Sequence, residues 1–117
     1  YLWPDAEGIT SQLVITVITA AIMAAELDLQ RSRTDGVFWA TAQGLKVLGA
    51  HEELFALRMK AHALNGDLAG VRFEFDSYQR AIASDSFSIT EPSQKLVSLL
   101  NRLTNNLVID QPVALAR

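Results

Sequence analysis

The sequence predicts an all-α domain, and three features of the chain support that prediction. Apolar residues recur at intervals of three and four along most of the chain, which is the spacing of one face of a helix. Turn-forming residues separate these periodic stretches, most clearly at Asn65-Gly66-Asp67. The same pattern returns when the chain is shifted by 34 residues. Together these features predict two helical hairpins followed by a fifth, capping helix.

Composition limits the kinds of function that the chain can have. Its 117 residues suffice for a single domain with a modest core. Half of the residues are hydrophobic and 20% are charged, which indicates an ordered globular domain. The net charge of -3 and the scattered Lys and Arg residues lack the basic footprint of a nucleic-acid-binding domain. Without cysteine, disulfides and thiolate metal sites are excluded, and a cytoplasmic location is expected.

The first helix is expected over residues 9–30, after an ordered lead-in over residues 1–8. The β-branched run at residues 15–19 favours a strand by local propensity. A helix is predicted nevertheless, because the less apolar residues follow one another at intervals of four and three, as one stripe along a helix. These are Gln12, Thr16, Thr19, Met23, Glu26 and Gln30. Such a helix is expected to pack on two sides and to be open along the stripe.

The uncharged run at residues 13–25 is bounded by Gln12 and Glu26, which leaves it short of the roughly 20 residues that span a bilayer. No basic residue precedes the run, so it does not resemble a signal peptide. No membrane contact is expected from this segment. The chain starts without Met, and we expect it to be a fragment of a larger protein.

The second helix is expected over residues 34–48, with Thr34 or Asp35 as its cap and Gly49 as its stop. Gly44 within it costs about 1 kcal/mol relative to alanine, which predicts close approach of another helix. Its inner face is expected to consist of Val37, Thr41, Leu45 and Leu48.

The second hairpin is expected to start near His51, to turn at Asn65-Gly66 and to continue from Asp67, which caps the helix over residues 68–84. The two inner faces are Leu54, Leu57, Ala61 and Leu64, and Val71, Phe75, Tyr78 and Ile82. A loop at residues 85–90, with Phe87 and Ile89 packed back, leads to a Pro-containing start of the fifth helix at residues 90–93. The domain is expected to end at residue 108, with residues 109–117 as a tail. The apolar face of the fifth helix is Leu96, Leu99, Leu100, Leu103 and Leu107.

The repeat has a known counterpart. A shift of 34 residues places Gly36-Val37 on Gly70-Val71 and Trp39 on Phe73. Two helices in 34 residues is the tetratricopeptide spacing, which predicts a tetratricopeptide-like α-α superhelix whose last helix covers the open apolar side. A four-helix bundle with similar loops stays open as an alternative.

The run LFALRMKAHALNGDLAGVRFEFDSYQRAI, followed by EPSQKLVSLLNRL, resembles the bacterial transcriptional activator domain, a tetratricopeptide-like module of actinobacterial regulators. WATAQGL, at residues 39–45, resembles the helix that closes the first repeat of that family, and the similarity covers residues 9–103. The chain departs from the family at residues 73–75, where smaller residues are usual. Matching positions are Leu57, Met59, Ala61, Gly66, Asp67, Tyr78, Pro92 and Leu99.

The resemblance implies a role in protein interaction or self-association. In this family the domain accompanies a winged-helix DNA-binding domain, or it belongs to LysM-containing, membrane-anchored proteins, which residues 1–3 and 39–45 resemble more. The expected partner is another domain of the parent chain, a regulatory protein or a second copy as a homodimer. Contact with nucleic acid is not expected through this domain.

No catalytic, cofactor or metal site is expected. His51 and His62 lack the i, i+4 spacing of a zinc pair on one helix face, and both are interpreted as ordinary surface histidines. The carboxylate pairs at residues 26 and 28, 52 and 53, and 74 and 76 point apart on a helix. The sequence contains no phosphate-binding loop and no nucleophile elbow.

The candidate binding residues come from the repeat, because the first helix of each tetratricopeptide hairpin lines a concave surface. These residues are Thr16, Thr19, Met23, Glu26, Glu53 and Lys60. A mixed surface of this kind suits a peptide or helix lying in a groove. Arg58 and Arg72 are interpreted as solubilising residues. Two alternatives stay open: nucleic-acid contact through a basic face of Arg31, Arg33 and Lys46, and small-ligand sensing in a closed apolar cavity.

Overall fold

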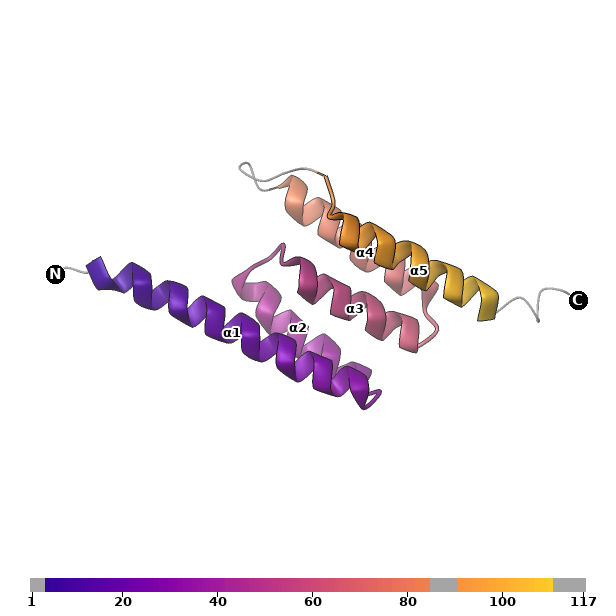
Figure 1. Ribbon diagram of the computed structural model, residues 1–117, viewed down its shortest axis with the longest axis horizontal. Coiled ribbons are helices and arrows are strands. Elements are labelled where there is room, and N and C mark those ends of the chain that lie inside the picture. Colours follow the sequence, from indigo (N-terminus) through magenta and orange to yellow (C-terminus); the bar gives the residue numbers. More distant parts are fainter. Residues whose placement is uncertain (1–3, 85–90, 111–117) are drawn as a thin grey trace, which may run out of the picture.

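The computed structural model describes residues 4–84 and 91–110, with side chains over residues 11–84 and 91–107. The described part is helical, with short turns and no strand. The prediction of an all-α chain is therefore confirmed. The helices are α1 (Pro4–Gln30), α2 (Thr34–Val47), α3 (Glu52–Leu64), α4 (Leu68–Ala83) and α5 (Gln94–Asp110), as Figure 1 shows.

The helices stack in chain order as two hairpins and a single helix. α1 pairs with α2, α3 packs against both of them, and α4 pairs with α3. α5 then packs against α3 and α4. In Figure 1, α1, α3 and α5 form the nearer layer and α2 and α4 the farther one. α3 therefore lies at the centre of the nearer layer, with α1 on one side and α5 on the other.

The core is divided between the second hairpin and the first. Large side chains from α3, α4 and α5 form the main cluster, which includes Phe55, Met59, Phe75, Tyr78 and Leu96. The first hairpin is attached to α3 by smaller side chains, Ala25, Val37, Ala40, Leu57 and Ala61. Leu54 joins Ile18 and Ala21 in a third cluster. Most of the apolar volume therefore lies between α3, α4 and α5.

Two glycines mark equivalent close contacts in the hairpins. Gly36 at the start of α2 lies against the Asp28 side chain, and Gly70 at the start of α4 lies against His62. Each neighbour occupies the space that a Cβ atom would need, so any larger residue would displace it. Both members of the second pair lie 34 positions after those of the first, so the sequence repeat recurs in the packing.

Several local expectations are confirmed. Gly66 has a φ of 73°, and Asp67 Oδ1 accepts a hydrogen bond from the Gly70 N–H at 2.9 Å as the cap of α4. Gly44 marks a close approach, because a Cβ there would lie 2.7 Å from Leu54 Cδ1 and 3.2 Å from Ala21 Cβ. Phe87, Ile89 and residues 111–117 of the predicted tail lie outside the described residues, whereas residues 109 and 110 belong to α5 and not to a tail.

The start of α1 and the cap of α2 differ from the prediction. α1 begins at Pro4 and not at residue 9, since proline is favoured in a first helical turn where its missing N–H costs nothing. α2 has no side-chain cap: Arg33 holds the capping position, and the Thr34 hydroxyl donates to Asn65 Oδ1 at 3.2 Å. Ser32, with a φ of 59°, makes the turn tight enough for the helix to begin at Thr34.

Some side chains predicted for inner faces are exposed. Leu48 is 43% exposed and Leu64 is 52% exposed, because each lies at the end of a helix, beyond the turns that its neighbours cover. The predicted inner face of α4 is confirmed, since Val71, Phe75 and Ile82 are buried with Tyr78.

α1 packs on one side, although its pattern predicts two. Ile18, Ala21 and Ala25 are buried against α2 and α3, whereas Leu13 and Ile15 are each 59% exposed. Within the described residues, one stretch, Ser11–Gln30, is long and apolar enough to cross a membrane by length and composition alone. Its mean hydropathy is 1.7, and 17% of it is buried inside the molecule. This stretch is longer than the uncharged run at residues 13–25 on which the sequence prediction was based, because it includes Glu26 and Asp28.

Candidate interaction site

The predicted binding residues lie on two helices of the nearer layer. Thr16, Thr19, Met23 and Glu26 are exposed along α1. Glu53 is exposed on α3, and Lys60 is half-buried two turns further along the same helix. The structure brings the two α3 residues into one hollow, whereas the four α1 residues line neither of the hollows described next.

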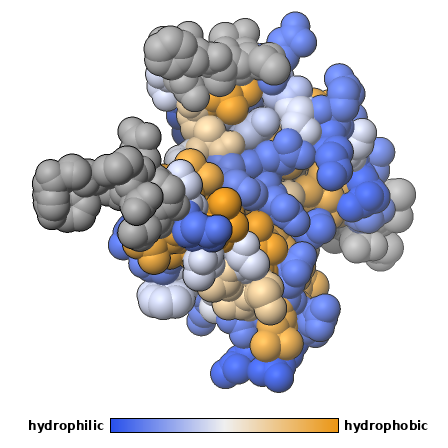
Figure 2. Space-filling model, turned by 60° about the vertical axis from the view of Figure 1, so that its left-hand side comes forward, coloured by the Kyte–Doolittle hydropathy of each residue, from blue (hydrophilic) through white to orange (hydrophobic). Residues whose placement is uncertain are grey.

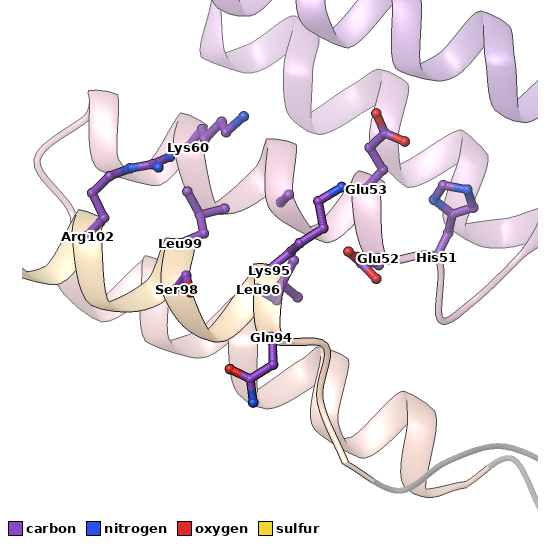
Figure 3. A pocket seen from close by; sticks show the side chains of 11 residues that line it. His51, Glu52, Glu53, Lys60, Gln94, Lys95, Leu96, Ser98, Leu99 and Arg102 are labelled. Atoms are coloured by element: carbon purple, nitrogen blue, oxygen red, sulfur yellow. The ribbon is translucent and has the colours of Figure 1, made fainter.

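An open hollow of about 810 Å³ lies between α3 and α5. Figure 3 shows its charged ends: Lys60 and Arg102 lie close together at one end, and Glu52 and His51 lie at the other. Lys95 extends across the middle towards Glu53. Among the described residues, neither Lys60 nor Arg102 has a carboxylate within ion-pair distance. This end of the hollow therefore offers two unneutralised cations to a partner.

A second open hollow, of about 470 Å³, adjoins the first along α3. Lys60 lines both hollows. The second hollow is mainly apolar, with walls from α1 and α5 on either side of α3. Its lining residues are Leu29, Gln30, Lys60, Ala63, Leu64, Leu103, Asn106 and Leu107. The two hollows form one groove, here called the α3 groove, with α3 as its floor.

Sequence reasoning missed the contribution of α5 to this groove. The sequence predicts the fifth helix as a cap, and that prediction assigns no role to its polar positions. Lys95 and Arg102 are seven residues apart and therefore lie on one helix face. This spacing could have indicated a charged wall on the fifth helix. Leu103 and Leu107 belong to the apolar face that was expected to be covered.

A buried polar cluster joins α2, α3 and α4. Glu74, with 3% of its side chain exposed, accepts a hydrogen bond from Arg58 Nε at 2.9 Å. Arg58 Nη1 also donates to the Phe38 carbonyl oxygen at 3.2 Å and to Thr41 Oγ1 at 3.1 Å. The guanidinium lies 5.2 Å from the centre of the Phe38 ring. Arg58 is thus a structural link between hairpins, which corrects its interpretation as a solubilising residue.

His62 belongs to the same cluster and is not an ordinary surface residue. Its Nε2 lies 3.0 Å from Glu74 Oε2, and its Nδ1 lies 3.5 Å from Asp67 Oδ2. Its ring packs against Phe38, with 4.5 Å between centroids, and 18% of its side chain is exposed. The surface interpretation was wrong because it considered α3 alone, whereas the carboxylates come from the start and interior of α4.

This cluster has a structural role in the part of the chain that is described. Both carboxylate oxygens of Glu74 are occupied, one by Arg58 and one by His62. None of the cluster residues lines either hollow of the α3 groove. Over the described ranges, no group of three or more His, Asp or Glu side chains is arranged to hold a metal ion. The groove can therefore act through shape, charge and apolar contact.

Comparisons with protein-family models, with curated proteins and with solved structures give no match for this chain.

Proposed function

We propose that this chain is a non-catalytic protein-interaction module of a bacterial transcriptional regulator, and that it binds its partner in the α3 groove. The observation that carries the proposal is the groove itself: two adjoining hollows share Lys60, the first lying between α3 and α5 and the second between α1 and α5 over α3. One hollow is charged and the other is apolar. This combination suits an amphipathic helix or an extended peptide.

The repeat supports a tetratricopeptide-like arrangement. The contacts of Gly36 with Asp28 and of Gly70 with His62 are related by the 34-residue period of that repeat. α1 and α3 are the first helices of their hairpins, and both border the groove. The assignment to a transcriptional regulator comes from the resemblance to the bacterial transcriptional activator domain.

The charges along the groove specify the partner further. Lys60 and Arg102 favour an acidic group, such as Asp, Glu or a chain-terminal carboxylate. Leu103 and Leu107 in the adjoining hollow favour apolar side chains next to it. The proposed partner segment therefore has apolar residues on one face and an acidic group at one end.

The structure does not favour the two alternatives. Arg31 and Arg33 lie at the start of α2 and Lys46 lies at its end, so they are separated by about 18 Å of helix and do not form a compact basic face. Both hollows of the groove are open, whereas the small-ligand alternative was based on a closed apolar cavity.

A displayed peptide library tests the proposal. Peptides selected by the wild-type chain should combine apolar residues with Asp or Glu, and fluorescence anisotropy should then measure their affinity. Replacing Lys60→Glu together with Arg102→Glu is expected to weaken binding at least tenfold, or by about 1.4 kcal/mol.

The matched control is Thr16→Glu with Thr19→Glu, which adds the same type of charge to exposed positions outside both hollows. The control should bind the selected peptides like the wild type. Equal weakening by both variants would show that binding lies elsewhere on the nearer layer, and selection of basic peptides would contradict the assigned charge preference.

A further inference from the structure

α1 carries a second apolar face that no part of the described chain covers. Leu13, Val17 and Leu27 are 59%, 38% and 46% exposed, and Ala20 and Ala24 between them are also exposed. These five residues follow one another at intervals of four, three, four and three, so they form one straight stripe, here called the α1 seam. The seam lies on a different side of α1 from Ile18, Ala21 and Ala25, which are buried against α2 and α3.

The two ends of the helix stack differ in polarity. α5, at one end, has polar side chains at all of its exposed positions over residues 94–107, some of which line the α3 groove: Gln94, Lys95, Ser98, Asn101, Arg102, Asn105 and Asn106. α1, at the other end, exposes the apolar seam. Figure 2 shows hydrophobic residues in a band that runs from beside the grey N-terminal residues towards the lower edge of the molecule. Stacked helical repeats need a polar outer face where they end. The α5 end meets this requirement and the α1 end does not, so the seam needs a partner.

The pattern of the seam is self-complementary. If two copies of α1 run antiparallel about a two-fold axis at Ala20, Leu13 of each copy lies opposite Leu27 of the other. Val17 is then level with residue 23 of the other copy and lies within one residue, about 1.5 Å along the helix axis, of its Ala24, so a larger side chain lies near a smaller one. The alanines at the centre allow the helices to approach closely, and the seam is about 21 Å long from residue 13 to residue 27.

We propose that the α1 seam is a homodimer interface in which two copies of the chain pair antiparallel through α1. The two-fold arrangement is the commonest symmetry of soluble oligomers, and the seam meets its requirement that one surface complement itself. No charged residue lies between residues 13 and 25, so the paired seams bring no like charges together. The residues of the seam line neither hollow of the α3 groove.

A membrane is the competing occupant, and the observations favour it less. Residues 9–30 contain no Lys or Arg, which a helix lying on an anionic lipid surface would use to bind the headgroups. Insertion of Ser11–Gln30 across a bilayer would also remove Ile18, Ala21 and Ala25 from their contacts with α2 and α3.

Cysteine cross-linking tests the register directly, because the chain contains no native cysteine. Ala20→Cys places the thiol on the proposed axis, so mild oxidation should convert most of the protein into a covalent dimer. Thr19→Cys is the matched control: it is exposed on the same helix but lies about 100° round from the seam, and it should remain monomeric on a denaturing gel. Equal cross-linking of both variants, or none of Ala20→Cys, would overturn the proposed register.

Light scattering after gel filtration, at several concentrations, tests the interface without cross-links. The wild type should form a dimer whose dissociation constant rises at least tenfold in the variant Ala20→Glu with Ala24→Glu. Both positions are exposed in the single chain, so thermal unfolding checks that the fold is retained.

A wild type that is monomeric at every concentration, or a dimer that survives in the variant, would overturn the proposal. The proposal would also be overturned if the wild type floated with phosphatidylglycerol vesicles and the same variant did not. Peptide binding in the α3 groove should be unchanged in this variant, so failure of the dimer is distinguishable from failure of the groove.

Discussion

Glu74 is the acid on which three helices converge, because Arg58 and His62 bind its two oxygens and Arg58 reaches on to α2. A buried ion pair of this kind contributes little net stability, since the desolvation of both charges offsets their attraction. Removal of one partner is nevertheless costly, because the other charge is then left buried and unpaired. The cluster therefore fixes the position of the hairpins relative to each other more than it stabilises them.

The single change Arg58→Met is expected to destabilise the fold by about 3 kcal/mol, because it leaves the Glu74 carboxylate buried without its guanidinium. The double change Arg58→Met with Glu74→Leu should return to within about 1 kcal/mol of the wild type, since no buried charge remains. Urea unfolding of both variants and of Glu74→Leu alone measures the coupling. If the double variant is no more stable to urea than the less stable of the two single variants, the cluster contributes net stability.

Ser32 is the non-glycine residue with a positive φ in the described chain, at 59°. Ser32→Gly is expected to raise the free energy of unfolding by about 0.5 to 1 kcal/mol, because glycine adopts this conformation without steric cost. Gly66→Ala is the opposite control: its φ is 73° and nothing lies within 4 Å of the added Cβ, so conformation alone should destabilise it by about 1 kcal/mol. Thermal unfolding should show a higher melting temperature than the wild type for Ser32→Gly and a lower one for Gly66→Ala.

At the scale of the helix, the sequence predicted what one helix shows by itself. The inner face of α4, the cap at Asp67 and the close approach at Gly44 depend on local spacing and residue type, and all three are present. The sequence could not show which apolar side of α1 is covered, because both sides carry a regular apolar stripe. The wall that α5 gives to the groove and the pairing of His62 depend on neighbours far along the chain, so spacing within one helix did not reveal them.

Gly44 lies where α2 approaches α1 and α3 closely enough to leave no room for a Cβ atom. Gly44→Ala improves helix propensity by about 1 kcal/mol. It should nevertheless destabilise the chain by about 1 to 3 kcal/mol, because Leu54 is fully buried and cannot move away from the new Cβ. Gly49→Ala is the control, since its nearest neighbour is a backbone oxygen at 3.8 Å and its stability should stay within about 0.5 kcal/mol of the wild type. Chemical denaturation compares the two, and a stabilising Gly44→Ala would show that the helices can separate without cost.

At the scale of the molecule, the position of α5 decides how the core is closed. Its buried leucines belong to the same cluster as Phe55, Met59 and Tyr78, so the main core is complete only when α5 is in place. The first hairpin packs on α3 through two separate clusters, one around Val37 and Leu57 and the other around Ile18 and Leu54.

Leu96→Ala is expected to lower the stability of the whole molecule by about 2 to 4 kcal/mol, because Leu96 is 1% exposed and its loss leaves a cavity. Leu64→Ala removes the same atoms from a side chain that is 52% exposed, and it should cost less than about 1 kcal/mol. Thermal unfolding followed by circular dichroism gives both values. Equal losses would contradict the role of α5 in closing the core.

The bond from Arg58 to the backbone oxygen of Phe38 has a consequence for how the sequence can diverge. The acceptor is a main-chain atom, so any residue that keeps α2 helical at that position supplies it. The ion pair has no such freedom, because a lineage that loses Glu74 keeps an unmatched guanidinium until Arg58 is also lost. Among descendants of this chain, residues 58 and 74 should therefore change together, whereas residue 38 is constrained by its ring, which lies against Arg58 and His62, and not by this bond.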